Sequence, residues 1–333
     1  MYYIMQGEEI DPMEKRFISR EPWYHKYLRQ GSVLICLIVL CLFFSILSPD
    51  FLNSRNLISV IRSCSVTIII AMGMLVVIIT GGIDLSLGCI VAVCGVFLAK
   101  MLVGGMSPFI AVPITLGIGM LMGLVNGVLI AYFDLQPFLV TLGTQVIYRG
   151  FALLYTTGRP VTNVPTSYCS IVGGKLFGWL PMPVVIMAIT VLAFYWVIKY
   201  TKTGVYVYAI GGNAEAAKLS GIDVRKYKMR AYIMDGLLCA LGAATMLGRL
   251  GAAEPTAASG YELDAIAAAA IGGTSLAGGK GSVIGTVLGA LILQVLTNGM
   301  TLMNVQSYYQ QIVTGIVIIV AVLIDRFTNK TAK

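Results

Sequence analysis

Charge is scarce in this chain. Charged residues make up 11% of the 333 residues, hydrophobic residues make up 58%, and the mean hydropathy is +0.87. A soluble domain normally carries about 25% charged residues. The scarcity therefore excludes an ordinary soluble domain and indicates that most of the chain faces lipid or its own membrane-buried neighbours.

Residues that perform catalysis or bind metals are equally scarce. The only histidine, His25, lies in the polar N-terminal segment, so a Ser–His pair cannot form within the apolar segments. No H-E-x-x-H or similar spacing of metal ligands occurs. Six of the seven cysteines lie in or near apolar segments as small packing residues, so no disulfide framework is implied. We expect no catalytic residue and no metal site.

The chain also lacks its own means to drive transport. The sequence GGKGS at 278–282 resembles the end of a phosphate-binding loop, but Thr274 replaces the first glycine of such a loop and Gly281 replaces its Ser or Thr. Nor does the sequence hold a chain of buried Asp, Glu or His suited to proton relay. We expect no cofactor on this chain, and the energy for any uphill transport must come from elsewhere.

Long apolar stretches are abundant in the sequence. A helix needs about 17–25 apolar residues to cross a bilayer. Candidates occur at 31–48, 60–80, 86–103, 109–132, 138–156, 180–199, 229–249, 263–278, 283–301 and 308–325, of which the third and eighth are short and rich in glycine. We predict an all-α polytopic membrane protein with about ten transmembrane helices.

The positive charges follow a topological pattern. If the N-terminus is cytoplasmic, ten crossings return the C-terminus to the cytoplasm, and sixteen of the 23 Lys and Arg residues then lie inside. We predict a cytoplasmic segment at 1–30, a transmembrane domain at 31–326 with a cytoplasmic loop at about 200–229, and a cytoplasmic tail at 327–333. Since the cations alternate with apolar segments, they argue against a basic face for nucleic acid.

Small residues recur at four-residue spacing on several apolar segments. Helices in lipid approach closely along such stripes, and we expect packing within the chain rather than a subunit interface. The stripes are Gly119, Gly123 and Gly127; Gly236, Ala240, Ala244 and Gly248; and Gly285 and Gly289.

Two glycine-rich interruptions, 81–88 and 272–279, form a weak internal repeat. Each is followed by a glycine-studded segment that reaches an Asn-Gly pair, at Asn126 and at Asn298. Paired interruptions of this kind indicate a transport pathway, so Asp84, Asn126 and Asn298 are pathway candidates. The alternative is an ordinary turn in which Asp84 caps the following helix.

Three further charged residues near the apolar segments have simpler explanations. Asp235 lies about one helical turn from Arg230, so a juxtamembrane ion pair explains it as well as a substrate contact does. Arg149 and Arg249 fall near the predicted outer surface, where their side chains can reach water.

A polar island at 208–229 stands between two apolar blocks. Asn213 is a strong N-cap and Gly221 a strong C-terminal stop for a short helix. The small residues Ala214, Ala217 and Gly221 share one face of it, and such a smooth face can enter a groove on another protein. The alternative is an ordinary basic connector, but a connector does not need this pattern of glycine, alanine and caps.

The short helix resembles the E-A-A-x-x-x-G signature by which permease subunits of ABC importers meet their ATPases. Residues 215–217 and Gly221 match this signature. The chain departs from it after Ile222, where Asp223-Val224 replace the usual Leu-Pro.

The chain after about residue 30 resembles the ribose-type sugar permeases of binding-protein-dependent ABC importers. The matching blocks are GGIDLSLGC at 81–89, QPFLVTLGTQ at 136–145, YAIGGNAEAAKLSGID at 208–223, GYELDAIAAAAIGGTSLAGGKGSV at 260–283 and YYQQIVTGIVIIVAVLIDR at 308–326. The resemblance implies a permease of the bacterial inner membrane that pairs with an identical copy or a paralogue. It would receive a monosaccharide or similar small polar solute from an extracytoplasmic binding protein.

The same resemblance implies that an ABC ATPase, which uses ATP and Mg²⁺, docks on the helix at 213–221 from the cytoplasmic side. The implied docking residues are Gly211, Gly212, Asn213, Glu215, Ala216, Ala217, Lys218 and Gly221. Two other functions fit a membrane protein of this composition. An ion-gradient-driven carrier would move its substrate without any ATPase, and a membrane scaffold or receptor would form complexes without flux.

Overall fold

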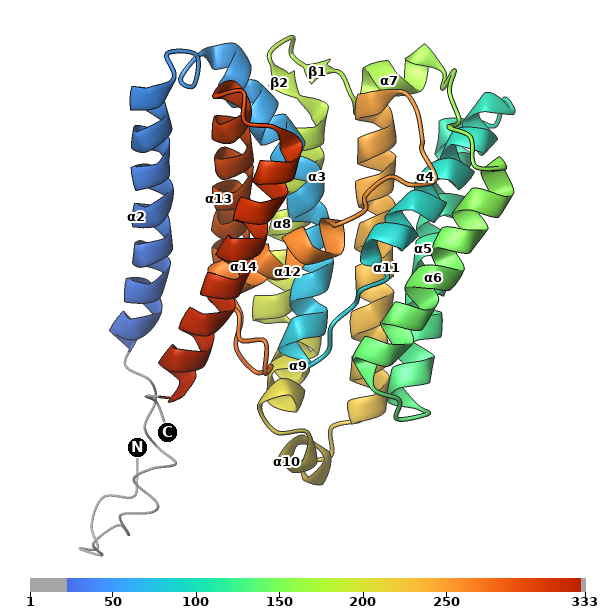
Figure 1. The fold of residues 1–333 in the computed structure, drawn as a ribbon. Helices are drawn as coiled ribbons and strands as arrows, with labels where there is room; N and C mark the ends of the chain where they lie inside the picture. The colour runs from blue at the N-terminus through green and yellow to red at the C-terminus, as the bar shows by residue number, and fades with distance from the viewer. Residues whose placement is uncertain (1–22, 331–333) are drawn as a thin grey trace, which may run out of the picture.

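A computed structural model of the protein describes residues 23–330, which form a bundle of long α-helices with one short β-hairpin (Figure 1). The helices are α2 (Trp23–Leu47), α3 (Ser54–Ile79), α4 (Leu87–Val103), α5 (Pro108–Ala131), α6 (Pro137–Thr156), α7 (Thr166–Val172), α8 (Met182–Tyr200), α9 (Lys202–Gly212), α10 (Ala214–Leu219), α11 (Val224–Leu250), α12 (Tyr261–Ile271), α13 (Val283–Leu302) and α14 (Ser307–Lys330). Strands β1 (Lys175–Leu176) and β2 (Leu180–Pro181) pair antiparallel. The hairpin, α7 and α9 are absent from the sequence-based prediction.

Within the described residues, six helices are long and apolar enough to cross a membrane, namely α3, α5, α6, α8, α11 and α13. Three shorter apolar stretches lie in α2, α4 and α14. The predicted class, an all-α polytopic membrane protein, is confirmed. The number of about ten spans stays a prediction, because α4 has 17 residues and α12 only 11.

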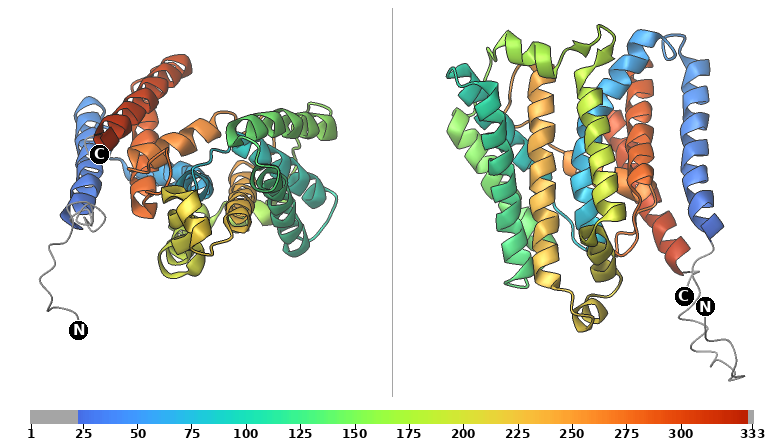
Figure 2. Two further views of the ribbon diagram at one scale, coloured as in Figure 1. Left: turned by 90° about the horizontal axis from the view of Figure 1, so that it is seen from below. Right: turned by 180° about the vertical axis from the view of Figure 1, so that it is seen from behind.

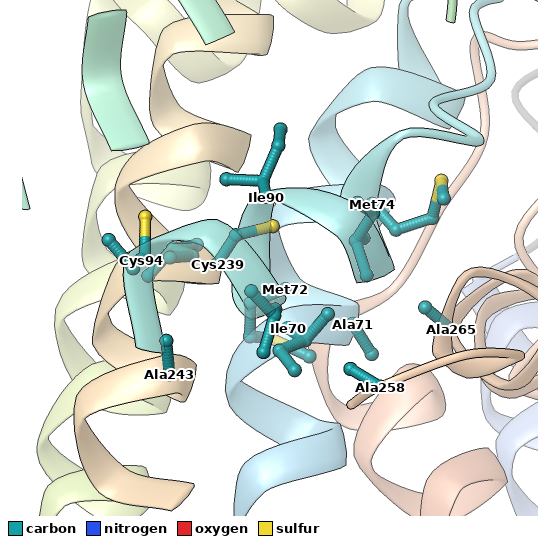
Figure 3. Packing of buried hydrophobic residues seen from close by; sticks show 14 of the residues in the cluster. Ile70, Ala71, Met72, Met74, Ile90, Cys94, Cys239, Ala243, Ala258 and Ala265 are labelled. Carbon is teal, nitrogen blue, oxygen red and sulfur yellow. The ribbon is translucent and has the colours of Figure 1, made fainter. Parts of the chain in front are cut away.

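Helix α3 forms the centre of the bundle. It packs against α8, α11, α12 and α13, and its side chains from Ile68 to Ile79 are almost wholly buried. The sequence explains this position, because a helix that is apolar on all sides buries its whole circumference. Figure 3 shows Met72 of α3 among Ile90 of α4, Cys239 of α11 and Ala265 of α12, all members of one hydrophobic core.

The small-residue stripes hold helices together within the chain. A Cβ built on Gly119 of α5 would overlap the carbonyl oxygen of Gly236 on α11, and one on Gly236 would overlap that of Gly119. The third stripe holds α13 against α12, since a Cβ on Gly289 would overlap the carbonyl oxygen of Ala268. Backbones this close leave no room for a side chain at the crossing. The expected role in internal packing is confirmed.

Two half-length helices, α4 and α12, are reached through non-helical segments. Residues 80–86 lead from α3 to α4, residues 251–260 lead from α11 to α12, and residues 272–282 lead on to α13. Helix α12 lies about half-way along the bundle (Figure 1). Non-helical backbone at such depth is tolerated in a membrane protein only where it is buried in protein or lines a cavity.

The start of α2, the end of α14 and helix α10 all lie at one end of the bundle, and the β-hairpin lies at the other (Figure 1, Figure 2). Helix α2 begins at Trp23, before the predicted boundary at residue 31, because polar residues with good helix propensity extend it beyond its apolar stretch. Helix α14 continues to Lys330, past the predicted boundary at 326. Residues 1–22 and 331–333 of the predicted cytoplasmic segments lie outside the described residues.

Candidate docking helix and transport pathway

Helix α10 has the caps that the sequence predicts. The side chain of Asn213 accepts a 3.0 Å hydrogen bond from the backbone N–H of Ala216, as an N-cap does. Gly221 follows the helix with φ +82°, a left-handed conformation that favours glycine. The helix itself covers Ala214–Leu219, and Asp223 caps the start of α11 by accepting from the N–H of Lys226 at 3.0 Å.

The exposed face of α10 differs from the predicted one. Ala217 is only 5% exposed and Ala214 is half-buried, so this part of the small-residue stripe faces the chain's own interior, while Gly221 at its end is exposed. The helix instead presents Glu215, Ala216 and Lys218, together with Leu219, which is 89% exposed. Leu219 is absent from the sequence-based set of docking residues. The signal that could have found it is a large apolar side chain placed among charged neighbours on a six-residue helix.

Asp84 and Asn126 belong to one buried hydrogen-bond network. Oδ1 of Asp84 accepts from the backbone N–H of Ser86 at 2.7 Å and from its hydroxyl at 2.6 Å. Nδ2 of Asn126 on α5 donates to Oδ2 of Asp84 at 3.1 Å and to Oγ of Ser86 at 2.8 Å. All three side chains are fully buried. The network fixes the turn before α4, but Asp84 does not cap the helix itself, because Ser86 occupies the N-cap position and no side chain caps it.

Asp235 forms no juxtamembrane ion pair, and that expectation is wrong. Its side chain is fully buried on α11 and points at α3, where its Oδ1 occupies the place that a Cβ on Gly73 would take. Within the described chain, no amide, hydroxyl or amine donates to its Oδ2. The carboxyl group of Asp235 lies close to that of Asp84.

Asn298 lies in a different place from Asn126. Its amide exchanges two hydrogen bonds of 2.9 Å with the amide of Asn56 on α3. The Asn56 amide also donates to the carbonyl of Phe51 at 2.9 Å. Asn298 therefore joins α13 to α3, and the structure does not bring it to the Asp84 network.

Arg149 does not reach outward to water as expected. Its guanidinium donates to the carbonyl oxygens of Pro255 at 2.7 Å and Ala257 at 3.1 Å, and to the hydroxyl of Ser259 at 3.1 Å. This side chain thereby ties α6 to the segment that leads to α12. Arg249 also binds within the chain, with a 3.4 Å hydrogen bond to the carbonyl of Arg62.

The N-terminal ends of α4 and α12 meet beside Arg149. A Cβ built on Gly88 would lie 2.5 Å from Oε2 of Glu262 and would overlap the carbonyl oxygen of Ala258. The backbone N–H of Gly260 donates to Oε1 of Glu262 at 3.3 Å. Arg149 and Glu262, both half-buried, are charged residues at the junction of two interrupted helices that the sequence reasoning did not select.

A cavity of about 360 Å³ lies between α4 and α11 and is bordered by the segment at 252–257. Its wall is mostly alanine, valine and leucine, and Glu254 is the charged residue that borders it. Asp84, Asn126 and Asn298 do not line this cavity. Their contact with a substrate stays a prediction.

The chain matches the family model described as "Branched-chain amino acid transport system / permease component" over residues 56–322. The chain belongs to this permease family. It is 42% identical to the ribose import permease protein RbsC of Escherichia coli strain K12 over 322 residues, which cover 94% of this chain and 99% of that protein. It is 43% identical to the RbsC of Bacillus subtilis strain 168, over 97% of this chain and 99% of that one.

Other relatives are named after different sugars. The D-allose transport system permease protein AlsC of Escherichia coli strain K12 is 36% identical over 95% of this chain and 96% of its own length. The search of solved structures found no match. As a member of this family the protein is a permease subunit of the bacterial cytoplasmic membrane, and the ATPase activity lies in a separate subunit.

Proposed function

We propose that the protein is the permease of an ABC importer that carries a monosaccharide into the cell. The observation that carries this proposal is the combination of high identity to ribose permeases along almost the whole chain with a capped, exposed helix between α9 and α11. The family description names branched-chain amino acids, whereas the most similar relatives carry the names of ribose, allose, galactose and xylose. We therefore propose a neutral sugar as the substrate.

Transport in proteoliposomes tests this function. The permease would be reconstituted with its purified ATPase and binding protein, and uptake of labelled ribose, allose, galactose, xylose and leucine would be compared. We expect uptake of one sugar that requires ATP and continues in the presence of an uncoupler. Uptake of leucine instead would overturn the sugar assignment. Uptake by the permease alone, driven by a proton or sodium gradient, would overturn the importer assignment.

The ATPase docks on α10, and Leu219 is the apolar side chain that enters its groove. Burial of a leucine side chain contributes about 1.5–3 kcal/mol, and a side chain already 89% exposed gains nearly all of this on docking. Asn213 and Gly221 cap the helix, Gly211 and Gly212 precede it, and Glu215, Ala216 and Lys218 present the surface around Leu219.

Co-purification with the ATPase tests the docking surface. Leu219→Asp should abolish ATPase binding while membrane insertion stays intact, whereas Leu219→Met, which keeps an apolar side chain, should retain it. Trp179→Asp offers a control at the opposite end of the bundle, since Trp179 is also exposed. Normal ATPase binding by Leu219→Asp would exclude Leu219 from the interface.

The pathway runs along the side of the bundle where Arg149 of α6 bonds to the segment that leads to α12. Arg149 and Glu262 lie there, half-buried, beside a helix half-way along the bundle (Figure 1). Ionisable side chains at that depth rarely face lipid, because leaving water is costly for a charge. A second permease copy and the sugar between the two copies would cover this side. Asp84 and Asn126 would then stabilise the pathway wall indirectly, by fixing the turn before α4.

The α10 end of the bundle faces the cytoplasm. Both described ends of the chain lie on that side (Figure 1), and seven of the cations that the sequence places inside lie at 199–230. With α2, α4, α12 and α14 counted with the six long helices, residues 23–330 hold ten membrane helices, and the binding protein approaches from the hairpin end. A C-terminal fusion to a fluorescent protein should be fluorescent, and a fusion to alkaline phosphatase should be inactive. The reverse pattern would invert the topology.

A further inference from the structure

Three separate segments of the chain meet at the cytoplasmic end of the bundle, next to α10. They are the end of α3 with the first residues of the following interruption (79–82), the last turn of α9 (210–212), and the turn between α12 and α13 (278–281). The backbone N–H of Gly279 donates to the carbonyl of Ile79 at 2.9 Å, and the hydroxyl of Tyr208 on α9 donates to the carbonyl of Gly281 at 2.9 Å. We call these three segments the glycine junction.

The backbones in the glycine junction touch without intervening side chains. A Cβ built on Gly211 would overlap the carbonyl oxygen of Ile79 and lie 2.5 Å from the N of Gly279. A Cβ on Gly278 would lie 3.0 Å from the N of Gly81 and 3.1 Å from the carbonyl oxygen of Gly211. Gly81, Gly278 and Gly279 have φ of +83°, +90° and +73°, a region where L side chains are strained. Glycine is therefore required here for both space and conformation.

The glycine junction connects α10 with both interrupted segments of the chain. Gly211 stands three residues before Ala214, the first residue of α10. Gly81 begins the segment that leads to α4, and Gly278 lies in the segment that joins α12 to α13. Contacts between side chains can adapt by changing rotamers, but contacts between backbones cannot. A displacement of α10 must therefore move the end of α3 and the 278–281 turn with it, or break the junction.

We propose that the glycine junction transmits the movement of α10 to both interrupted helices, α4 and α12, and so couples ATP use to opening of the pathway. The inference rests on the proposed function, because it takes α10 to be the helix on which the ATPase docks. It assigns Gly211, Gly278 and Tyr208 a positioning role in coupling, distinct from docking. Energetic coupling between sites is established by perturbing the element that joins them, and the junction offers matched substitutions for this purpose.

Gly211→Ala and Gly212→Ala form the matched pair. A Cβ on Gly212 would meet no atom within 4 Å, whereas one on Gly211 would overlap the α3 backbone. Gly117→Ala on the open face of α5 controls for the substitution type, because a Cβ there also meets nothing within 4 Å. Each variant would be assembled with the ATPase and binding protein, and ATPase binding, ATP hydrolysis and sugar uptake would be measured together.

We expect Gly211→Ala to keep ATPase binding and hydrolysis but to lower the sugar transported per ATP by about tenfold or more. Gly212→Ala should lose much less, and Gly117→Ala should match the wild type. Unchanged sugar per ATP in Gly211→Ala would overturn the proposal. Loss of ATPase binding in Gly211→Ala would also overturn it, because the residue would then act in docking.

Tyr208→Phe keeps the test decisive if Gly211→Ala fails to fold. It removes only the hydroxyl that bonds Gly281 and adds no atom, so it should lower sugar per ATP severalfold with ATPase binding intact. An unchanged ratio in Tyr208→Phe would then overturn the proposal. Failure of the proposed function itself looks different, because the wild-type protein would show no ATP-driven uptake at all.

Discussion

Residues 80–86 and residues 272–282 interrupt the bundle with similar glycine-rich sequences, but different contacts hold each of them. The first interruption is fixed by side chains, since Asp84, Ser86 and Asn126 form a closed network of hydrogen bonds. The second is distinguished by close contacts between backbones, besides the hydrogen bonds of the Ser282 and Tyr208 side chains at its end. A Cβ on Gly272 would overlap the carbonyl oxygen of Gly285, and the N–H of Ser275 donates to the carbonyl of Lys280 at 3.0 Å.

Each interruption therefore tolerates a different kind of substitution. A hydrogen-bonded network in a membrane interior loses stability when a polar atom is removed, because its buried partners then have no water to replace it. A backbone contact loses stability when an atom is added, because packed backbones cannot move aside. The first interruption should therefore be sensitive to deletion of polar groups and the second to added carbon.

Gly289→Val on α13 should give the largest effect. Its side chain would force α13 away from Ala268 of α12, and overpacking of this kind typically costs about 1–3 kcal/mol and occasionally more. Here both neighbours are backbone, so we expect about 3 kcal/mol or more, seen as loss of the folded protein in detergent melting experiments. Gly143→Val on α6 is the control, since a Cβ there meets nothing within 4 Å. Equal loss from both would show that valine itself, and not the close approach, is responsible.

Asp84→Ala should give the next largest effect, by removing the acceptor at the centre of the first interruption. The N–H of Ser86 would lose its side-chain acceptor, and an unsatisfied buried group costs about 1–3 kcal/mol. Asp84→Asn keeps one oxygen for Ser86, and its new NH₂ group can donate to Oδ1 of Asn126 once the Asn126 amide turns over. We expect Asn to be milder than Ala by about 1 kcal/mol or more in melting experiments.

Transport assays with Asp84→Asn separate the two roles of this residue. Retained uptake together with retained stability supports the turn before α4 as its main role. Loss of uptake in a stable variant would instead place the Asp84 carboxyl in the pathway.

The fold class and the position of α10 could be predicted from the sequence because local signals specify them. Long apolar runs specify membrane helices, and Asn213 and Gly221 specify the limits of a short helix through backbone capping. The face that α10 exposes could not be predicted, because burial of Ala217 depends on how the flanking helices pack. Asp235 was misassigned for a related reason. Its distance from Arg230 along the helix is local, but its neighbours Gly73 and Asp84 come from far away in the sequence.

The weak sequence repeat does not predict the hydrogen-bond partners of the two Asn-Gly pairs. Asn126 bonds to the first interruption, so its counterpart Asn298 should bond to the second, but Asn298 pairs with Asn56 on α3 instead. A double-mutant cycle with Asn56→Ala and Asn298→Ala should give a coupling of about 0.6 kcal/mol, the average for hydrogen bonds between membrane helices. Thermal melting in detergent measures it. A coupling near zero, with transport reduced by Asn298→Ala alone, would restore Asn298 to the pathway.

The smallest effect should come from Thr274 in the second interruption, and Thr80 in the first interruption provides the comparison. The hydroxyl of Thr80 donates to the carbonyl of Val77 at 2.7 Å, so Thr80→Val should cost about 1 kcal/mol of stability. The hydroxyl of Thr274 is buried and has no partner within the described chain. Its removal in Thr274→Val, which keeps the shape of the side chain, should be neutral or slightly stabilising in the same melting experiment.

This threonine pair also tests whether a polar atom in the second interruption serves transport. A buried hydroxyl without a partner lowers stability, so its presence at Thr274 needs another reason. If passing sugar or a moving backbone bonds it during transport, Thr274→Val will lower uptake while the protein melts at the same or a higher temperature. Unchanged uptake in Thr274→Val would exclude a role of this hydroxyl in transport.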